Sequence, residues 1–221
     1  MNQEPIEIKS KINGNITAYA IPGHFATAHA HVNFYIDVTN VKHQHTMARN
    51  AAIAFASFYA SNTVVDTIVC TDNSEVIGAF LARELTRPSY MSVNDGTAIN
   101  VVAPEFTPNG QMMFRDNIKS MVYGKNILLL ISSVITGKTL ARSLECISYY
   151  GGAVSGIAAI SSSMEEFQGT QIHSIFSPSD LPEYNIFSAQ ECPFCKAHRK
   201  IDALSTVSYT HLAVCTSMSS L

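Results

Sequence analysis

The chain has little charge, and no segment of it collects charge of one sign. Of its 221 residues 14% are charged, the formal net charge is −3, and the Lys and Arg residues are scattered along the sequence. A protein that binds DNA or RNA normally carries a basic patch or stripe against the phosphates. The sequence therefore argues against a nucleic-acid partner and favours a ligand of the size of a nucleotide.

Long hydrophobic runs are also missing. Apolar runs such as Ile127 to Ile131 and Val154 to Ile160 are far shorter than the roughly 20 residues that a membrane-spanning helix needs. The first ten residues, MNQEPIEIKS, lack the apolar core of a secretory signal. We therefore expect a soluble, cytoplasmic protein without a membrane partner.

Cysteine is scarce, and its five residues form no disulfide framework. Cys70 and Cys146 lie inside apolar segments, as small buried hydrophobic residues do. An odd number of cysteines without a regular spacing indicates a reducing compartment.

Hydrophobic residues make up 47% of the chain, which is sufficient for one well-packed domain with a small appendage. Hydrophobic periodicity predicts strands at 31–38, 64–70, 99–103, 127–131 and 153–160, and helices at 46–60, 75–85 and 138–150. This alternation is typical of an α/β fold with a doubly wound, mostly parallel sheet. Residues 104–117 carry two Pro and one Gly without periodicity, so we expect a long mobile loop there.

The most informative segment runs from Ile127 to Leu144, where ILLLI is followed by SSVITGKT and then by a helical pattern. A strand, a short turn and a helix start direct backbone N–H groups and the positive end of the helix dipole to one place, which predicts a phosphate site. The turn also approaches the P-loop pattern GxxxxGK[ST], with Ser132 in place of the first Gly. Earlier strands precede it and the next strand ends in AISSS, without an acidic residue for Mg²⁺. A P-loop nucleotide triphosphatase therefore remains the less favoured alternative.

Three segments, in order, resemble the type I phosphoribosyltransferases, and among them the orotate phosphoribosyltransferase-like proteins. The segment ILLLI-SS-VITGKT-LARSLECISYYGG keeps the strand, the VIT, the Gly, the Thr and the helix of the family's phosphate loop. HVNFYID resembles the family's hood segment, and VDTIVCTDNSEVIGAFLARELT resembles its strand, pyrophosphate loop and helix. The resemblance covers about residues 30 to 165 and implies the type I phosphoribosyltransferase fold.

The resemblance also implies a role for each segment. Residues that bind the ribose and its 5-phosphate would be Ser132, Ser133, Val134, Ile135, Thr136, Gly137, Lys138 and Thr139. Those beside the pyrophosphate would be Thr71, Asp72, Asn73, Ser74 and Glu75, and Phe34 and Tyr35 would stack on the base. Arg115, the only cation of the flap at 104–116, would be the catalytic residue that stabilises the leaving group. The substrates would be phosphoribosyl pyrophosphate with Mg²⁺ and a nucleobase, a pyrimidine such as orotate, and the chain would form a homodimer.

The sequence departs from the family at the acidic pair that grips the ribose hydroxyls, which is Ser132 and Ser133 here. Two charge-assisted hydrogen bonds would become neutral ones, each costing on the order of 1 kcal/mol of affinity. Two functions therefore stay open: a phosphoribosyltransferase, and a catalytically weakened relative that binds nucleotide or phosphoribosyl pyrophosphate as a regulator.

The segment ECPFCKAH places Cys192, Cys195 and His198 at a spacing typical of metal ligands. It predicts a candidate Zn²⁺ site that still needs a fourth ligand; the alternative is a cysteine-rich turn that caps a helix beginning near Lys196. The N-terminal histidines lack the HxxxH spacing on a helix, so we expect them to be solvated or to stack on a base; they are His24, His29, His31, His43 and His45.

Together these patterns predict four regions. They are an N-terminal hood segment at 1–45, the phosphoribosyltransferase core at 46–180, a C-terminal CxxC extension at 181–205, and a tail at 206–221. The tail is rich in Ser and Thr and shows no periodicity, so we expect it to be disordered or non-native.

Overall fold

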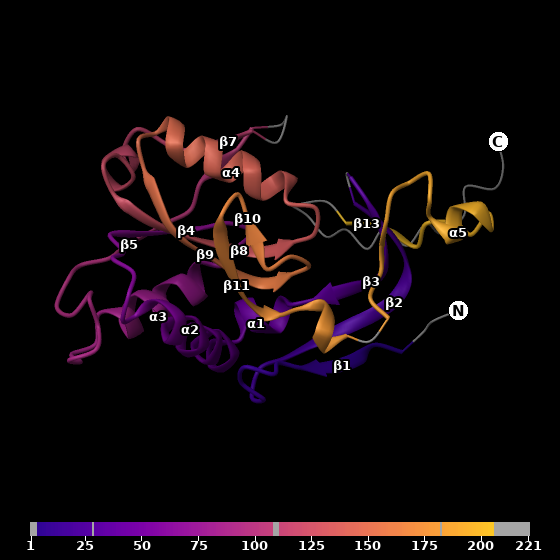
Figure 1. The fold of residues 1–221 in the computed structure, drawn as a ribbon, viewed down its shortest axis with the longest axis horizontal. Coiled ribbons are helices and arrows are strands. Elements are labelled where there is room, and N and C mark those ends of the chain that lie inside the picture. The colour runs from indigo at the N-terminus through magenta and orange to yellow at the C-terminus, as the bar shows by residue number, and fades with distance from the viewer. Residues whose placement is uncertain (1–3, 28, 108–110, 182, 206–221) are drawn as a thin grey trace.

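The computed structural model describes residues 4–27, 29–107, 111–181 and 183–205, and the predictions for the tail at 206–221 lie outside them. Two sheets organise these residues (Figure 1). The larger sheet has the strand order β10-β11-β9-β8-β4-β5. In that order its strands are Glu166–Phe167, Thr170–Phe176, Ala153–Ser162, Asn126–Val134, Thr67–Cys70 and Asn100–Val102.

Three main helices cover the larger sheet: α2 (His45–Tyr59), α3 (Glu75–Leu85) and α4 (Lys138–Tyr149). Strands β5, β4, β8, β9 and β11 are parallel, and only the short β10 is antiparallel to its neighbour. Successive residues of β8 alternate between the faces: Leu128 and Leu130 pack in the cluster with α2 and α3, and Leu129 packs in the cluster with α4. Helices thus lie on both faces, and the prediction of a doubly wound α/β fold is confirmed.

Residue Leu129 offers a direct test of this core. Its side chain is fully buried, and truncation leaves a cavity that costs about 2 to 5 kcal/mol. We expect Leu129→Ala to lower the free energy of unfolding by that amount, measured by urea denaturation with an unchanged slope. Val76→Ala, at a position on α3 that is 40% exposed, should change it by less than about 0.5 kcal/mol.

Helix α2 is fixed to the sheet by a polar contact as well as by apolar packing. The Tyr59 hydroxyl donates a hydrogen bond to the Ile157 carbonyl of β9 at 2.6 Å. The neighbouring Gly156 makes room for the ring, because a Cβ atom there would lie 2.7 Å from Tyr59 Cε1. Helix α2 begins at His45, one residue before the predicted start of this helix at residue 46.

Two sequence predictions differ from the structure near the predicted phosphate turn. Strand β8 continues through Ser132, Ser133 and Val134, so the turn before α4 is shorter than the polar run suggested. The segment predicted as a loop at 104–117 contains a hairpin of β6 (Glu105–Phe106) and β7 (Met112–Met113). Figure 1 shows β7 beside α4, and the Cys146 thiol of α4 donates to the Met112 carbonyl at 3.3 Å.

The smaller sheet joins the two ends of the described chain. It contains β1 (Ile6–Lys9), β2 (Thr17–Thr27), β3 (His31–Asp37) and β12 (Ile186–Phe187), and β13 (Ala203–Ser205) pairs with β2. The predicted hood segment and the CxxC extension therefore share one sheet, as the indigo and yellow strands of Figure 1 show. The remaining short helices are α1 (Thr39–His43), α5 (Pro193–Lys196) and two 3-10 turns at Lys119–Met121 and Pro178–Asp180.

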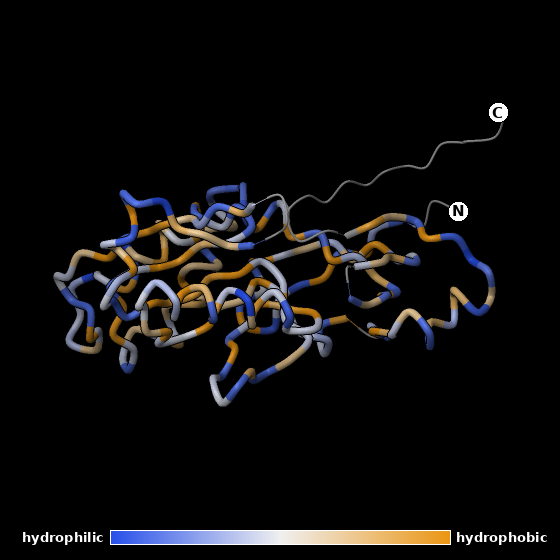
Figure 2. Tube along the Cα trace, turned by 90° about the horizontal axis from the view of Figure 1, so that it is seen from above, coloured by the Kyte–Doolittle hydropathy of each residue, from blue (hydrophilic) through white to orange (hydrophobic). Residues whose placement is uncertain are grey.

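Hydrophobic residues follow the strands of the interior, and hydrophilic residues gather at the outer turns (Figure 2). In the described part of the chain, every helix is too short or too polar to span a bilayer.

Candidate functional site

The larger sheet changes its winding direction between β4 and β8. These strands are neighbours, with Thr67 opposite Ile127 and Cys70 opposite Leu130. From β4 the chain passes to α3 on one face, and from β8 it passes to α4 on the other face. Two loops that leave in opposite directions open a crevice at the carboxyl edge of a parallel sheet, which is where such folds bind their ligands.

The loop after β4 is a tight and strained turn. Asp72 and Asn73 have φ values of 56° and 60°, a left-handed conformation that costs non-glycine residues about 1 to 3 kcal/mol each. The turn is held from both sides: the Thr71 N–H donates to the Leu130 carbonyl at 2.9 Å, and the Ser74 hydroxyl donates to the Thr71 carbonyl at 2.8 Å. These contacts fix the first turn of α3 at the edge of the crevice.

Asp72 is the acidic group of this edge. The pKa of its carboxyl group is raised to about 6, mainly by loss of hydration and to a smaller extent by the charge of Glu75. The charge of Lys42 and hydrogen bonds from the Thr71 hydroxyl and the Ser132 backbone N–H act in the opposite direction. A carboxylate therefore faces Ser132 from the neighbouring strand, although the sequence has no acidic residue at 132 or 133.

The loop after β8 is closed by Gly137, which precedes the first residue of α4. Its φ is +73°, and its carbonyl accepts a hydrogen bond from the Ala141 N–H at 2.8 Å. A Cβ atom at Gly137 would lie 2.7 Å from Cε2 of Phe167. Because both the backbone conformation and the space exclude a side chain, only glycine fits here.

Two carbonyl groups of this loop accept hydrogen bonds, whereas two of its backbone N–H groups have no partner among the described residues. The Ser163 hydroxyl donates to the carbonyls of Val134 and Ile135. Within the described chain, the N–H groups of Thr136 and Gly137 donate no hydrogen bond, and the first N–H groups of α4 have no partner inside the helix. Donors without partners at a helix N-terminus are suited to an anion such as phosphate.

Solved structures share this architecture. The chain matches the Mycobacterium tuberculosis H37Rv orotate phosphoribosyltransferase in complex with inorganic phosphate, with a TM-score of 0.50 and 13% identity over 67% of this chain and 80% of that one. A phosphoribosyltransferase from Corynebacterium diphtheriae matches with a TM-score of 0.50 and 14% identity over 73% and 90%. The chain has the type I phosphoribosyltransferase fold. Leishmania donovani UMP synthase also matches, with a TM-score of 0.50 and 15% identity, over 76% of this chain and 33% of that longer one.

Searches by sequence give no such match: neither the models of known protein families nor the curated proteins match the chain. The resemblance of the three sequence segments to this fold is nevertheless confirmed by the structural comparison. The phosphoribosyltransferase fold also disfavours the P-loop alternative, since the SSVITGKT segment lies in and after a central strand that follows two earlier strands of the same sheet.

Within this phosphoribosyltransferase fold, the predicted phosphate-loop residues differ in exposure. Lys138 is exposed at the start of α4, and Thr136 and Thr139 are half-buried at the same edge. Ser133 is exposed, whereas Ser132 and Val134 are buried. The candidate site at this edge therefore consists of residues 135–139 and the turn at 71–75.

Other predicted site residues make their contacts outside these two loops. Phe34 packs against the core cluster under α2, and the Tyr35 ring lies 5.9 Å from the Phe25 ring. Arg115 follows the β6–β7 hairpin, and its Nε lies 2.5 Å from Oε1 of Glu105 in an exposed ion pair.

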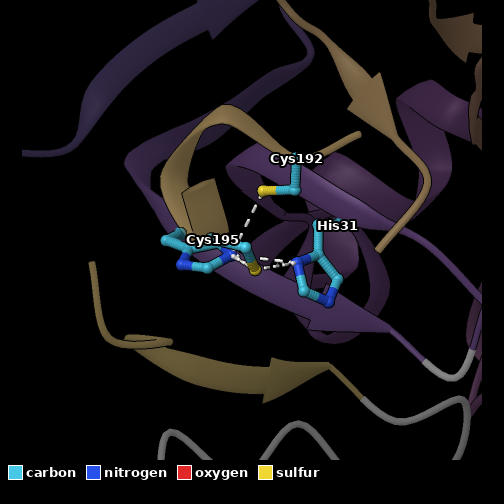
Figure 3. Close-up of side chains that lie close together, drawn as sticks. His31, Cys192 and Cys195 are labelled. Carbon is cyan, nitrogen blue, oxygen red and sulfur yellow. Dashed lines mark hydrogen bonds between the residues drawn. The ribbon is translucent and has the colours of Figure 1, made fainter. Parts of the chain in front are cut away.

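A second group of candidate functional side chains lies beside the smaller sheet. His24, His31, Cys192 and Cys195 each direct a ligand atom to one place, and these four atoms lie within 4.8 Å of one another. Figure 3 shows the labelled His31, Cys192 and Cys195 side chains pointing toward one another. His198 is exposed and does not belong to this group.

The expectation that the N-terminal histidines are solvated is wrong for His24, whose side chain is fully buried. The sequence contains both histidines, His24 and His31, but no local pattern marks them as metal ligands. His24 and His31 are brought together by a hairpin that turns between Thr27 and Ala30, and neither strand end carried a pattern that predicted pairing with residues 192–195.

Proposed function

We propose that the protein is a phosphoribosyltransferase that transfers phosphoribose from phosphoribosyl pyrophosphate to a nucleobase, a pyrimidine such as orotate. The proposed site is the crevice between β4 and β8. The observation that carries the proposal is the pair of loops after these strands, which direct unpartnered N–H groups and a half-buried carboxyl group to one edge of the sheet. The four described cysteines form no disulfide, in keeping with a cytoplasmic protein. We further propose that the chain forms a homodimer.

The 5-phosphate would occupy the loop at 135–139. The N–H groups of Thr136 and Gly137 would donate to its oxygens, and the hydroxyls of Thr136 and Thr139, which make no hydrogen bond within the described residues, would add two further donors. The similar Mycobacterium tuberculosis enzyme was solved with inorganic phosphate, which supports a phosphate ligand in this fold.

The pyrophosphate would lie beside the turn at 71–75 with Mg²⁺. Asp72 and Glu75 offer carboxylate oxygens, the ligands that Mg²⁺ prefers when it is shared with phosphate groups, so this donor set fits the ion. When bound, Mg²⁺ would neutralise charge on the leaving pyrophosphate. The Asp72 carboxylate would accept a hydrogen bond from a ribose hydroxyl and so take over part of the role of the missing acidic pair.

The flap hairpin would close over these groups. As the bond from ribose C1 to pyrophosphate breaks and the bond from C1 to the base nitrogen forms, the ribose gains positive charge and must be shielded from water. An exposed ion pair such as Arg115 with Glu105 contributes little stability. Arg115 could therefore exchange Glu105 for the pyrophosphate at small cost, while Phe34 and Tyr35 would flank the base.

A second function, a regulator that binds the same ligand without turnover, is favoured by one observation. Ser132 and Ser133 supply neutral hydroxyls where two carboxylates would strengthen the grip on the ribose. Ser133→Asp separates the two functions, because Ser133 is exposed, whereas Ser132 is buried and its backbone N–H lies against the Asp72 carboxylate. A gain in pyrophosphate release would favour the weakened enzyme, and ligand binding with no release in either protein would favour the regulator.

The proposed ligand is tested by thermal unfolding with phosphoribosyl pyrophosphate and Mg²⁺, compared with ATP and Mg²⁺. At a concentration of about 100 times the dissociation constant, a ligand stabilises the folded state by about 2.7 kcal/mol. We expect stabilisation by phosphoribosyl pyrophosphate, none by ATP, and release of pyrophosphate when orotate is added. Stabilisation by ATP alone would contradict the proposal, and release with adenine instead of orotate would correct the base.

A further inference from the structure

The four clustered side chains beside the hood come from two distant parts of the chain. His24 and His31 lie on β2 and β3, whereas Cys192 precedes α5 and Cys195 lies within it. Two thiols and two imidazoles form one of the donor sets that hold structural zinc in proteins. None of the four belongs to the proposed phosphoribosyl site between β4 and β8.

Four of the six distances between the ligand atoms are close to those of a tetrahedral zinc centre, and the whole group lies within 4.8 Å. Bonds of about 2.0 Å to nitrogen and about 2.3 Å to sulfur place two nitrogens about 3.3 Å apart, and a nitrogen and a sulfur about 3.5 Å apart. Here Nε2 of His24 lies 3.0 Å from Nδ1 of His31, 3.4 Å from Sγ of Cys192 and 3.6 Å from Sγ of Cys195. The distance from Cys195 Sγ to His31 Nδ1 is 3.3 Å.

His24 is also held in the orientation of a metal ligand by its other nitrogen. Its Nδ1 lies 3.1 Å from the Arg199 carbonyl oxygen and 3.2 Å from that of Lys200. Because carbonyl oxygens only accept hydrogen bonds, Nδ1 must carry the proton, which leaves the lone pair of Nε2 directed at the cluster. Such a carbonyl partner behind the imidazole is typical of metal-bound histidine.

The local structure on both sides supports a built site. The register of β2 and β3 shifts between Pro22 and Phe25, and an irregularity of this kind redirects the side chain of His24. The His24 backbone N–H donates to Oδ2 of Asp202 at 2.7 Å, which fixes the C-terminal segment to the same position. His24 and Cys192 are fully buried, and His31 and Cys195 are half-buried.

We infer that His24, His31, Cys192 and Cys195 bind one Zn²⁺ ion that fastens residues 186–205 to the hairpin of β2 and β3. Four protein ligands leave no open position, so the ion is structural and does not activate water or substrate. His198, the third ligand that the spacing alone predicted, is replaced by two histidines from the opposite end of the described chain.

The fastened segment and the proposed phosphate loop pack against the same hydrophobic cluster. Next to His24, Phe25 packs with Val32 and with Ala203 of β13, and Ile135 of the loop packs against this same cluster. Zinc would therefore stabilise the hydrophobic cluster against which Ile135 packs. The stability of the smaller sheet would depend on the metal more than the stability of the larger sheet does.

The inference is tested first by the metal content of the full chain, purified under reducing conditions without added chelator. We expect about one zinc per chain. His24→Ala and Cys195→Ser should each lower the zinc content at least tenfold. His198→Ala and Cys146→Ser, the matched controls for the two ligand types, should keep it. Reconstitution with Co²⁺ should give the visible absorption of a tetrahedral centre with thiolate ligands.

Limited proteolysis keeps the test valid if a ligand variant folds poorly. Removal of zinc from the unmodified chain by a chelator should expose the 186–205 segment to cleavage while the larger sheet stays intact, and added zinc should restore protection. A purified chain that holds no zinc and gives no cobalt spectrum, a disulfide between Cys192 and Cys195, or loss of zinc in His198→Ala would each overturn the inference. Binding of phosphoribosyl pyrophosphate is read separately, so failure here leaves the proposed function standing.

Discussion

Replacing Gly137 with alanine is expected to abolish binding of phosphoribosyl pyrophosphate and to lower the free energy of unfolding by about 2 to 5 kcal/mol. Two effects act together. The φ of +73° strains any residue with a Cβ atom, and that atom would lie 2.7 Å from the Phe167 ring. Relief of the clash must move the loop, and the N–H groups of residues 136 and 137 then no longer point to one place.

Gly169 provides the matched control for this variant. Its φ is +80°, but no atom lies within 4 Å of the position of an added Cβ. Gly169→Ala should therefore show backbone strain alone, about 1 to 2 kcal/mol, and should keep the ligand. A double variant, Gly137→Ala with Phe167→Leu, should regain part of the lost stability. Both quantities are measured by urea denaturation and by calorimetric titration, and full ligand binding by Gly137→Ala would contradict the assigned role of the loop.

Replacing Asp72 with asparagine is expected to stabilise the folded protein at neutral pH and to weaken the binding of phosphoribosyl pyrophosphate. The pKa of Asp72 rises from 3.8 to about 6 on folding, mainly because its carboxyl group is desolvated. The folded protein thus holds this proton more tightly than the unfolded chain, so the free energy of unfolding falls as the pH rises from about 4 to about 6. A shift of this size corresponds to about 3 kcal/mol, part of which the Asp72→Asn variant would regain.

The measurement is the free energy of unfolding between about pH 4 and pH 7.5 for both proteins. The asparagine oxygen can still accept the Ser132 N–H, so the turn at 71–75 should keep its shape. We expect the free energy of unfolding to fall as the pH rises in the unmodified protein and to change less with pH in Asp72→Asn. The variant should also lose Mg²⁺-dependent ligand binding. Glu183→Gln, at a position outside the crevice, should leave both unchanged. A variant that is less stable at neutral pH would contradict the assigned burial of the charge.

Local patterns predicted the elements that depend on local forces. Helix α3 was predicted at 75–85 and is found at Glu75–Leu85, because its apolar residues recur on one face and the TDNS turn precedes it. The end of β8 was missed. Ser132, Ser133 and Val134 alternate buried, exposed and buried, which is a strand pattern, but two consecutive serines also resemble a turn, and only the ladder with β9 decides between them.

Contacts between distant residues account for what the sequence could not predict. The carboxylate of Asp72 lies against Ser132 because β4 and β8 are neighbours in the sheet, although sixty residues separate them in the chain. Likewise, the pairing of β12 with β3 and of β13 with β2 brings the cysteine pair to His24 and His31. The spacing of the cysteines predicted two of the four ligands, Cys192 and Cys195. The sequence neighbour His198 was the wrong candidate for a further ligand, because the atoms that lie close to the two thiols belong to His24 and His31.

The central claim is that the backbone N–H groups after β8 hold a sugar phosphate. It is tested most directly by the amide signals of the protein in a nuclear magnetic resonance titration with ribose 5-phosphate. We predict the largest shifts, and slowed hydrogen exchange, at Thr136, Gly137, Lys138 and Thr139, with smaller shifts in the turn at 71–75 and none at the C-terminal end of α4. Saturable shifts confined to another surface, with these four signals unmoved, would contradict the claim.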